Sequence, residues 1–193
     1  MKLLTFALPS DGDHRLGLLS ADNRVLDLKS AAERTRLRLP FDPGSMLSLI
    51  EAGEAGLAAV ADLARQAGNP LALTDIRVLA PIPRPRKNVF CVGWNYPEHF
   101  QEGEKFRPGQ ELPQHPAFFS KAVTAVTGPF DPIPYDGAIS GKWDWEAELG
   151  VVIGKRGKNI TEAQAGGYVF GYTVVNDVSV RDLQRRHGGQ WHK

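Results

Sequence analysis

Carboxylates alternate along the segment GKWDWEAELGVVIG, at Asp144, Glu146 and Glu148, just before a run of valine and isoleucine. Alternate side chains of an extended strand share a face, so the three acids are expected to project together. The residues between them form the other face, which the pattern predicts to be core: Trp145, Ala147, Leu149 and Val151. A solvent-exposed acidic face would fit the alternation too, but the apolar run favours a covered one. Two carboxylates removed from water must be protonated, paired or bound to a metal.

A lone carboxylate, Asp177, lies among valines in TVVNDVSV, which is expected to be a second strand. Three hard oxygen ligands with no histidine or cysteine beside them suit magnesium, manganese or calcium better than zinc. We therefore predict a divalent metal site at Glu146, Glu148 and Asp177, with open positions for water and substrate. Asp144 has no ligand role in this scheme and is expected nearer the solvent end of its strand.

His99 and Glu102 are three residues apart in EHFQEG, which is expected to form a short helix. That spacing puts both side chains on one face of the helix, where the carboxylate can orient the imidazole. Such a pair can act as a general base toward water. The same spacing is common in surface ion pairs, so the two residues alone leave both interpretations open.

The first part of the chain contains three short strand-like runs, at 2–8, 14–20 and 23–29, separated by turns rich in Pro, Asp, Gly and Asn. This pattern indicates a small antiparallel meander. Apolar residues then recur at helical spacing over 46–53 and 54–68. Their stripe is expected to be buried: Leu57, Val60, Leu63 and Ala64.

Three prolines, Pro81, Pro83 and Pro85, form a rigid connector and place a domain boundary near residue 80. We expect a small α+β domain over 1–80 and a mainly β domain over 81–193. Strands are predicted in the second domain at 88–93, 116–128, 145–154 and 172–180. Short helices are expected over NYPEHFQEG, after a capping box of Thr161 and Gln164, and over RDLQRR. The polar stretch from Glu104 to His115 is expected to be a loop or lid.

The composition narrows the classes of function. The 193 residues carry a net charge of +1, which gives no field that would recruit nucleic acid, although a short basic cluster is present. That cluster is Arg181, Arg185, Arg186 and His187. The single cysteine, Cys91, rules out an internal disulfide, and no Cys/His cluster could hold zinc, so a reducing, cytoplasmic setting is expected. No apolar run approaches the roughly 20 residues that span a bilayer.

Four segments of the second domain have a characteristic order and spacing: VGWNYPEHFQEG, PAFFSKAVTAVTGP, WDWEAELGVVIG and VVNDVSVRDLQ. In these segments the chain resembles the fumarylacetoacetate hydrolase family, and the resemblance runs from about Pro81 to Lys193. Residues 1–80 resemble the small accessory domain of bacterial members. The resemblance implies a mixed β-sheet roll that holds one Mg(II) or Mn(II), in a homodimer. Family members continue past the position of Lys193 into strands that close the roll. The resemblance therefore also predicts a longer parent chain.

The resemblance also implies roles for single residues. The metal ligands fall on Glu146, Glu148 and Asp177, and the dyad that activates water falls on His99 and Glu102. Four further residues match family positions: Lys121 and Gln184 as substrate contacts, and Arg181 and Asp182 as residues that brace a helix. The stretch 103–115 takes the place of a lid. Trp94 departs from the leucine or arginine of relatives.

The function implied is a metal-dependent hydrolase that cleaves a carbon–carbon bond in a 1,3-diketo acid, such as an acylpyruvate or fumarylpyruvate, in aromatic catabolism. The products would be a 2-oxo acid and a carboxylic acid. The same enolate chemistry without water addition gives an isomerase or decarboxylase of 2-oxo or 2-hydroxymuconate-type acids, including oxaloacetate. A binder of metal or ligand without catalysis is the third alternative.

Overall fold

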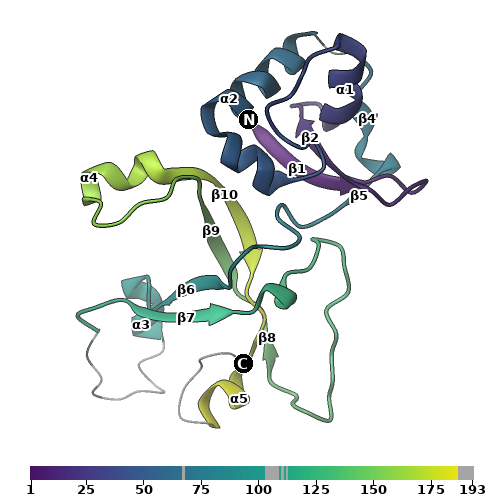
Figure 1. The fold of residues 1–193 in the computed structure, drawn as a ribbon. Coiled ribbons are helices and arrows are strands. Elements are labelled where there is room, and N and C mark those ends of the chain that lie inside the picture. The colour runs from purple at the N-terminus through teal and green to yellow at the C-terminus, as the bar shows by residue number, and fades with distance from the viewer. Residues whose placement is uncertain (67, 103–108, 110, 112, 187–193) are drawn as a thin grey trace. The chain divides into compact units, whose positions relative to one another are not determined.

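The computed structural model describes residues 1–66, 68–102, 109, 111 and 113–186, and at His99, Glu102 and Arg185 it describes the backbone only (Figure 1). The chain forms two compact units. The first comprises residues 1–83, 126–135 and 145–178, and the second comprises the remaining described residues. Because the first unit takes in residues from both halves of the sequence, the division into domains 1–80 and 81–193 stays a prediction.

An antiparallel sheet with the strand order β4-β3-β2-β1-β5 opens the first unit. Its strands are β1 (Lys2–Ala7), β2 (His14–Leu19), β3 (Arg24–Asp27), β4 (Leu71–Ala72) and β5 (Arg77–Val78). A 3-10 turn, η1 (Leu73–Asp75), joins the last two. The first three strands are the meander that the turn-rich sequence predicts.

Helix α1 (Leu28–Thr35) begins where the sequence predicted that the third strand would continue to residue 29. The Asp27 carboxylate causes the change, because it accepts the backbone N–H groups of Lys29 and Ser30 and so caps a helix. Arg36 ends the helix in the left-handed conformation. The predicted strand was therefore too long, and the helix was missed.

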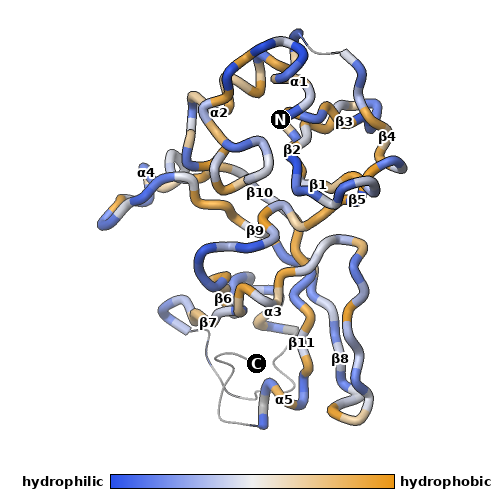
Figure 2. Tube along the Cα trace, turned by 45° about the vertical axis from the view of Figure 1, so that its right-hand side comes forward, coloured by the Kyte–Doolittle hydropathy of each residue, from blue (hydrophilic) through white to orange (hydrophobic). Residues whose placement is uncertain are grey.

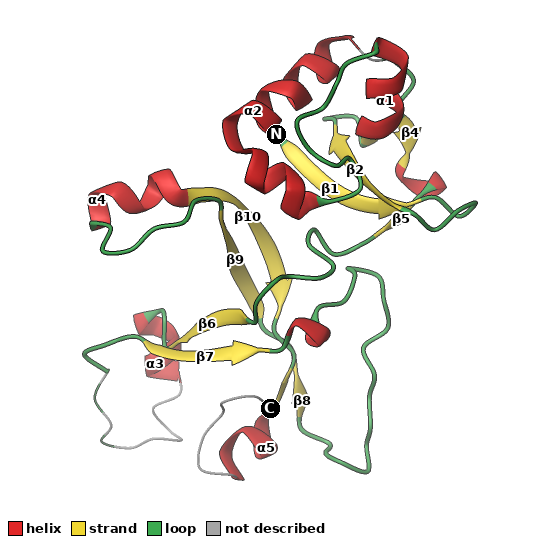
Figure 3. Cartoon of the chain, viewed as in Figure 1, coloured by secondary structure: helices red, strands yellow, loops and turns green. Residues whose placement is uncertain are grey.

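Helix α2 (Met46–Gln66) bends at Gly53, whose φ of 55° separates the two predicted helical runs. Both α1 and α2 contact β2 (Figure 3). The main core lies between these helices and the sheet, and its fully buried members include Leu16, Leu49, Val60 and Leu63. Of the predicted stripe, Val60 and Leu63 are buried, whereas Ala64 is exposed because it lies beyond the edge of the helix face that meets the sheet.

A long hairpin of β9 (Ala147–Ile153) and β10 (Val169–Asn176) completes the first unit. Between its strands lie α4 (Glu162–Ala165) and the 3-10 turn η4 (Gly166–Tyr168). The predicted capping box is present, since Gln164 accepts the backbone N–H of Thr161 at 3.2 Å. Val152 and Phe170 pack against the main core.

The prediction that Trp145, Ala147, Leu149 and Val151 form a core face is wrong. Trp145 is 71% exposed, Leu149 58% and Val151 49%, while Glu146 and Glu148 on the opposite face are half-buried. The physical reason is that Val152, on the carboxylate face, supplies the contact with the core. Alternation identifies two faces of a strand but not which of them is covered. The apolar end of β9 is orange in Figure 2.

The second unit contains two short antiparallel ladders. Strand β6 (Val89–Gly93) pairs with β7 (Ala117–Lys121), and β8 (Trp143–Asp144) pairs with β11 (Ser179–Val180). Its helical pieces are α3 (Pro97–Glu102), η3 (Val123–Ala125) and α5 (Arg181–Arg186). The strand predicted over 116–128 ends at Lys121, since η3 follows. Most of the predicted 104–115 lid lies outside the described residues. No helix in the described part of the chain is long and apolar enough to cross a membrane.

Candidate functional site

The backbone brings Glu146, Glu148 and Asp177 to one end of the β9–β10 ladder. Glu148 lies opposite Val175, and two residues further along the ladder the N–H of Asp177 donates to the carbonyl of Glu146 at 2.9 Å. Residues directly opposite each other in an antiparallel pair share a face, as do residues two apart in a strand. The three carboxylates therefore lie on one face of the hairpin, and all three residues are half-buried.

Asn176 ties this end of the ladder together. Its side-chain oxygen accepts the backbone N–H of Glu146 at 3.3 Å. Further along the face, a Cβ at Gly150 would come within 2.9 Å of Thr173 Cγ2 and 3.0 Å of Val175 Cγ2. Glycine at position 150 therefore leaves room for the side chains of Thr173 and Val175 on this face.

The carboxylates have the right chemistry for a hard divalent cation, because each offers anionic oxygen ligands. Their side chains are not gathered, however. Within the residues that the structure describes, no three His, Cys, Asp or Glu side chains are grouped closely enough to hold a metal ion. The ladder thus places the three residues on one face, and their convergence on a metal stays a prediction.

Lys121 and Gln184, the predicted substrate contacts, belong to the second unit, whereas the three carboxylates belong to the first. Lys121 is the last residue of β7, opposite Val89, and it is half-buried. Gln184 lies on α5 and is also half-buried. The joining of these two groups of residues into one site stays a prediction.

Helix α5, which carries Gln184, is fastened at its first two residues. The Arg181 guanidinium donates to Asp144 Oδ2 at 2.8 Å, and the Arg181 N–H donates to the Lys142 carbonyl at 2.9 Å. The hydroxyl of Ser140 donates to Asp182 Oδ1 at 2.7 Å. Arg181 and Asp182 therefore brace the helix, and Asp144 serves as an ion-pair partner.

Ser140 is a residue that the sequence did not single out. It is buried, and besides its bond to Asp182 its Oγ accepts the Lys142 N–H at 2.9 Å. Its carbonyl accepts the Trp143 indole N–H at 2.9 Å. The Ser140 hydroxyl also holds the pKa of the Asp182 carboxyl below its ordinary value. A serine in GAISGKWD follows no motif, so only the fold reveals this role.

Helix α3 forms where it was expected, with the predicted general-base pair on its backbone. The side chains of His99 and Glu102 lie outside the described part of the structure. Their spacing of three residues on one helix is established, and their pairing stays a prediction.

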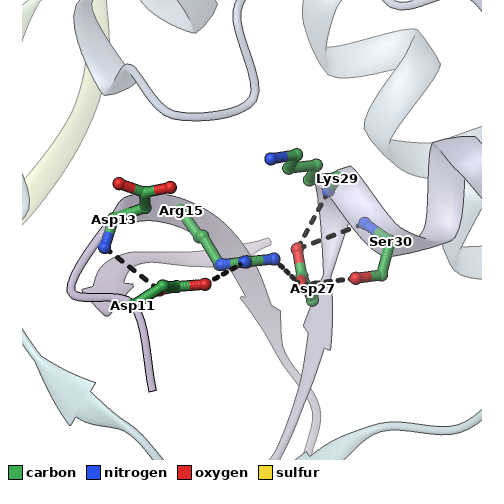
Figure 4. A network of polar contacts seen from close by, with 6 residues as sticks. All are labelled: Asp11, Asp13, Arg15, Asp27, Lys29 and Ser30. Carbon is green, nitrogen blue, oxygen red and sulfur yellow. Dashed lines mark hydrogen bonds and ion pairs between the residues drawn. The ribbon is translucent and has the colours of Figure 1, made fainter. Parts of the chain in front are cut away.

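A separate polar network in the N-terminal sheet is structural (Figure 4). The Arg15 guanidinium donates to Asp11 at 2.6 Å and to Asp27 at 3.1 Å, and the Asp27 carboxylate caps α1. Hydrogen bonding from Arg15 lowers the pKa of Asp11, and hydrogen bonding to Asp11 raises the pKa of Arg15. The network joins the first turn, β2 and α1.

Comparison with known proteins relates the chain to enzymes. Residues 88–193 match the family described as fumarylacetoacetate (FAA) hydrolase C-terminal. The chain is 37% identical over 180 residues to the oxaloacetate tautomerase YisK of Bacillus subtilis, covering 89% of this chain and 58% of that protein. It is 39% identical over 196 residues to the mitochondrial oxaloacetate tautomerase Fahd2a of Rattus norvegicus, covering 99% and 57%. The chain thus spans less than two thirds of the length of these relatives.

Solved structures share the fold. A fumarylacetoacetate hydrolase from Exiguobacterium antarcticum matches with a TM-score of 0.70 at 31% identity, over 99% of this chain and 60% of that one. A maleylpyruvate hydrolase from Sphingobium sp. SYK-6, in complex with manganese(II) and pyruvate, also gives a TM-score of 0.70, at 24% identity over 94% and 60%. These matches confirm the predicted α+β, mainly β fold.

Proposed function

Because the chain belongs to the fumarylacetoacetate hydrolase family, we propose that it catalyses the keto–enol interconversion of a short 2-oxo dicarboxylic acid such as oxaloacetate. The observation that carries this proposal is the identity of 37% and 39% to two oxaloacetate tautomerases. Isomerisation without water addition is one of the outcomes that the enolate chemistry allows. Because these relatives are tautomerases, we rank isomerisation first and carbon–carbon hydrolysis second among the candidate functions.

The reaction moves one proton and breaks no bond between carbon atoms. A proton leaves C3 of the keto form, and a proton is added to the oxygen on C2 to give the enol. Catalysis therefore needs a base near C3, a proton donor near the C2 oxygen and stabilisation of the enolate formed between them.

Glu146, Glu148 and Asp177 would hold the divalent cation, as Mg(II) or Mn(II), with Ca(II) as a further candidate. When bound, such a cation polarises a carbonyl and stabilises negative charge on its oxygen. The register of the β9–β10 ladder supports this assignment by putting the three acids on one face. A protein of the same fold has been solved with manganese(II) and pyruvate.

The second unit would supply substrate contacts and proton transfer. Lys121, at the end of β7, and Gln184, on the braced helix α5, would bind the carboxylates of the substrate. His99 on α3 would take the proton from C3, and Glu102 would hold the other ring nitrogen in the correct tautomer. The proposal also includes a homodimer and a role in aromatic catabolism, both of which rest on the family resemblance alone.

The test follows the ultraviolet absorbance of the enol after keto oxaloacetate is added to the purified protein and Mg(II). We expect the wild-type protein to bring the keto and enol forms to equilibrium faster than buffer alone does. We expect His99→Ala to lower kcat by about 10²- to 10⁴-fold, the usual contribution of a general base. Lys155→Ala removes an exposed lysine outside the proposed site and serves as the control, with an expected kcat equal to that of the wild type. Equal rates with and without the wild-type protein would contradict the proposal.

Hydrolysis of an acylpyruvate is kept as the second candidate because α3 forms as expected and carries a histidine and a glutamate at the spacing of a water-activating pair. Product analysis separates the two functions. A hydrolase releases pyruvate and a carboxylic acid from acylpyruvates and leaves the oxaloacetate keto–enol rate at the buffer value. Release of carbon dioxide and pyruvate from oxaloacetate would indicate a decarboxylase, and metal binding without turnover of any oxo acid would indicate a binder.

A further inference from the structure

The loop between β6 and α3 contains a tryptophan in an unusual conformation. Trp94 has a φ of 55°, in the left-handed region. Among the described residues, the other non-glycine positions with positive φ are Asn23, Arg36, Asn69 and Asn159. Asparagine tolerates this conformation, and Arg36 is where α1 ends, but a bulky aromatic side chain is disfavoured there by crowding of its Cβ. Such a conformation persists only where the surroundings hold it.

The indole of Trp94 contacts the helix that follows. Its ring and the ring of Phe100 have centroids 5.8 Å apart and planes at 85°, the edge-to-face arrangement that aromatic pairs favour. Phe100 comes directly after His99, and its backbone N–H donates to the Tyr96 carbonyl at 3.1 Å. Trp94 is 37% exposed, so the pair lies at the surface and outside any described core.

Helix α3 has six residues, Pro97–Glu102, which is far too few for stability in isolation. It therefore depends on contacts with the rest of the chain. The Trp94–Phe100 pair is one such contact, and it spans the turn in which the helix starts. The left-handed backbone at Trp94 also forms a bend in the chain between β6 and α3. The strained residue and the ring contact thus act on the same short helix.

We propose that Trp94 is a positioning residue, which fixes α3 through Phe100 and thereby sets His99 for proton transfer. This inference rests on the proposed function in assigning His99 as the base. Trp94 itself touches no reacting atom in this scheme. Its loss should therefore lower kcat and leave KM nearly unchanged, because the substrate contacts assigned to Lys121 and Gln184 lie on other elements.

The test combines hydrogen exchange of the α3 amides with steady-state kinetics on the purified protein. Trp94→Gly accommodates the left-handed backbone but removes the ring, so α3 exchange should become faster and kcat should fall about tenfold or more, as small displacements of a catalytic group do. Trp94→Phe keeps a ring that can meet Phe100 and should retain kcat within about threefold of wild type. Phe100→Leu removes the partner ring, and its effect should not add to that of Trp94→Gly.

The matched control is Asn159→Gly, which relieves a φ of 56° in a loop of the first unit and should change neither measurement. Unchanged α3 exchange in both Trp94→Gly and Phe100→Leu would overturn the inference. Faster exchange with wild-type kcat would also overturn it, because the helix would then be held without effect on chemistry. If wild type turns over no oxo acid, the NMR titration of the His99 ring replaces kcat: a changed titration in Trp94→Gly supports positioning, and an identical one contradicts it.

Discussion

The N-terminal sheet and the β9–β10 hairpin belong to one unit but differ in how far their apolar side chains are buried. Phe6, Leu16 and Val25 of the sheet are completely buried. In the hairpin, Leu149 is 58% exposed and Val174 83% exposed, although each of its strands contains at least two valines. The sheet is covered by its own helices. The open face of the hairpin, which carries Leu149, Val151 and Val174, is exposed among the residues that the structure describes.

The difference shows that the carboxylate-bearing hairpin is held mainly by its ladder and by the contact of Val152 and Phe170 with the main core. Its open face contributes little burial free energy within the described chain. Substitutions of apolar side chains should therefore change the free energy of unfolding much more in the sheet and its helices than on the open face of the hairpin.

Removal of a leucine side chain gives the largest contrast. Leu63→Ala empties a fully buried site in α2 and should lower the free energy of unfolding by about 2–5 kcal/mol. Leu149→Ala makes the same chemical change on the open face and should stay within about 0.5 kcal/mol. Urea unfolding of the two variants measures this. A large cost for Leu149→Ala would show that the hairpin face is covered in solution.

Addition of a methyl group should produce a smaller difference in stability between the two regions. A Cβ at Gly17 in β2 would come within 2.6 Å of Val25 Cγ1, so Gly17→Ala should cost about 1–3 kcal/mol through overpacking. In Gly171→Ala the new Cβ meets nothing within 4 Å, and stability should change little. The thermal unfolding midpoints of both variants test the prediction. A similar decrease of the midpoint in both would contradict the difference in packing between the two regions.

Acid pH should give the smallest effect, through Asp11 and Arg15. The folded-state pKa of Asp11 is lowered by its hydrogen bond from Arg15, so the ion pair stabilises the fold above the unfolded pKa of about 4. This contribution is lost as pH falls through the lowered pKa. Arg15→Met should therefore flatten the pH dependence of unfolding below about pH 4.

The control for that measurement is Arg65→Met, which removes an ion pair with Asp62 whose arginine side chain is 69% exposed. Exposed pairs contribute little, so its acid profile should follow the wild type. If the profile of Arg15→Met also follows the wild type, the network in Figure 4 does not stabilise the first turn and α1.

The sequence predicted elements wherever the local signal was strong. The meander, the break at Gly53, α3 and the capping box of Thr161 all follow from turn, helix and capping chemistry within a few residues. The helix after Asp27 was missed because the same letters, VLDLK, also alternate like a strand. Only the capping bonds of Asp27 decide between the two.

The candidate site was predictable only in part, for a different reason. Spacing put Glu146 and Glu148 on one face, and pairing with Asp177 follows from the register of the hairpin. Which face is covered depends on contacts with distant segments, and these reversed the expected burial of Leu149 and Val151. The bond from Ser140 to Asp182 joins residues 42 apart in the chain and has no local signal at all.

Calorimetric titration of the purified protein with Mn(II) tests the central claim most directly. We predict one equivalent bound per wild-type chain and an affinity lower by about tenfold or more in Glu148→Gln, since even outer partners of metal ligands cost that much. Glu162→Gln, an exposed glutamate on α4, should bind as wild type does. Equal affinities of wild type and Glu148→Gln for Mn(II) would contradict the claim that this carboxylate face is the metal site.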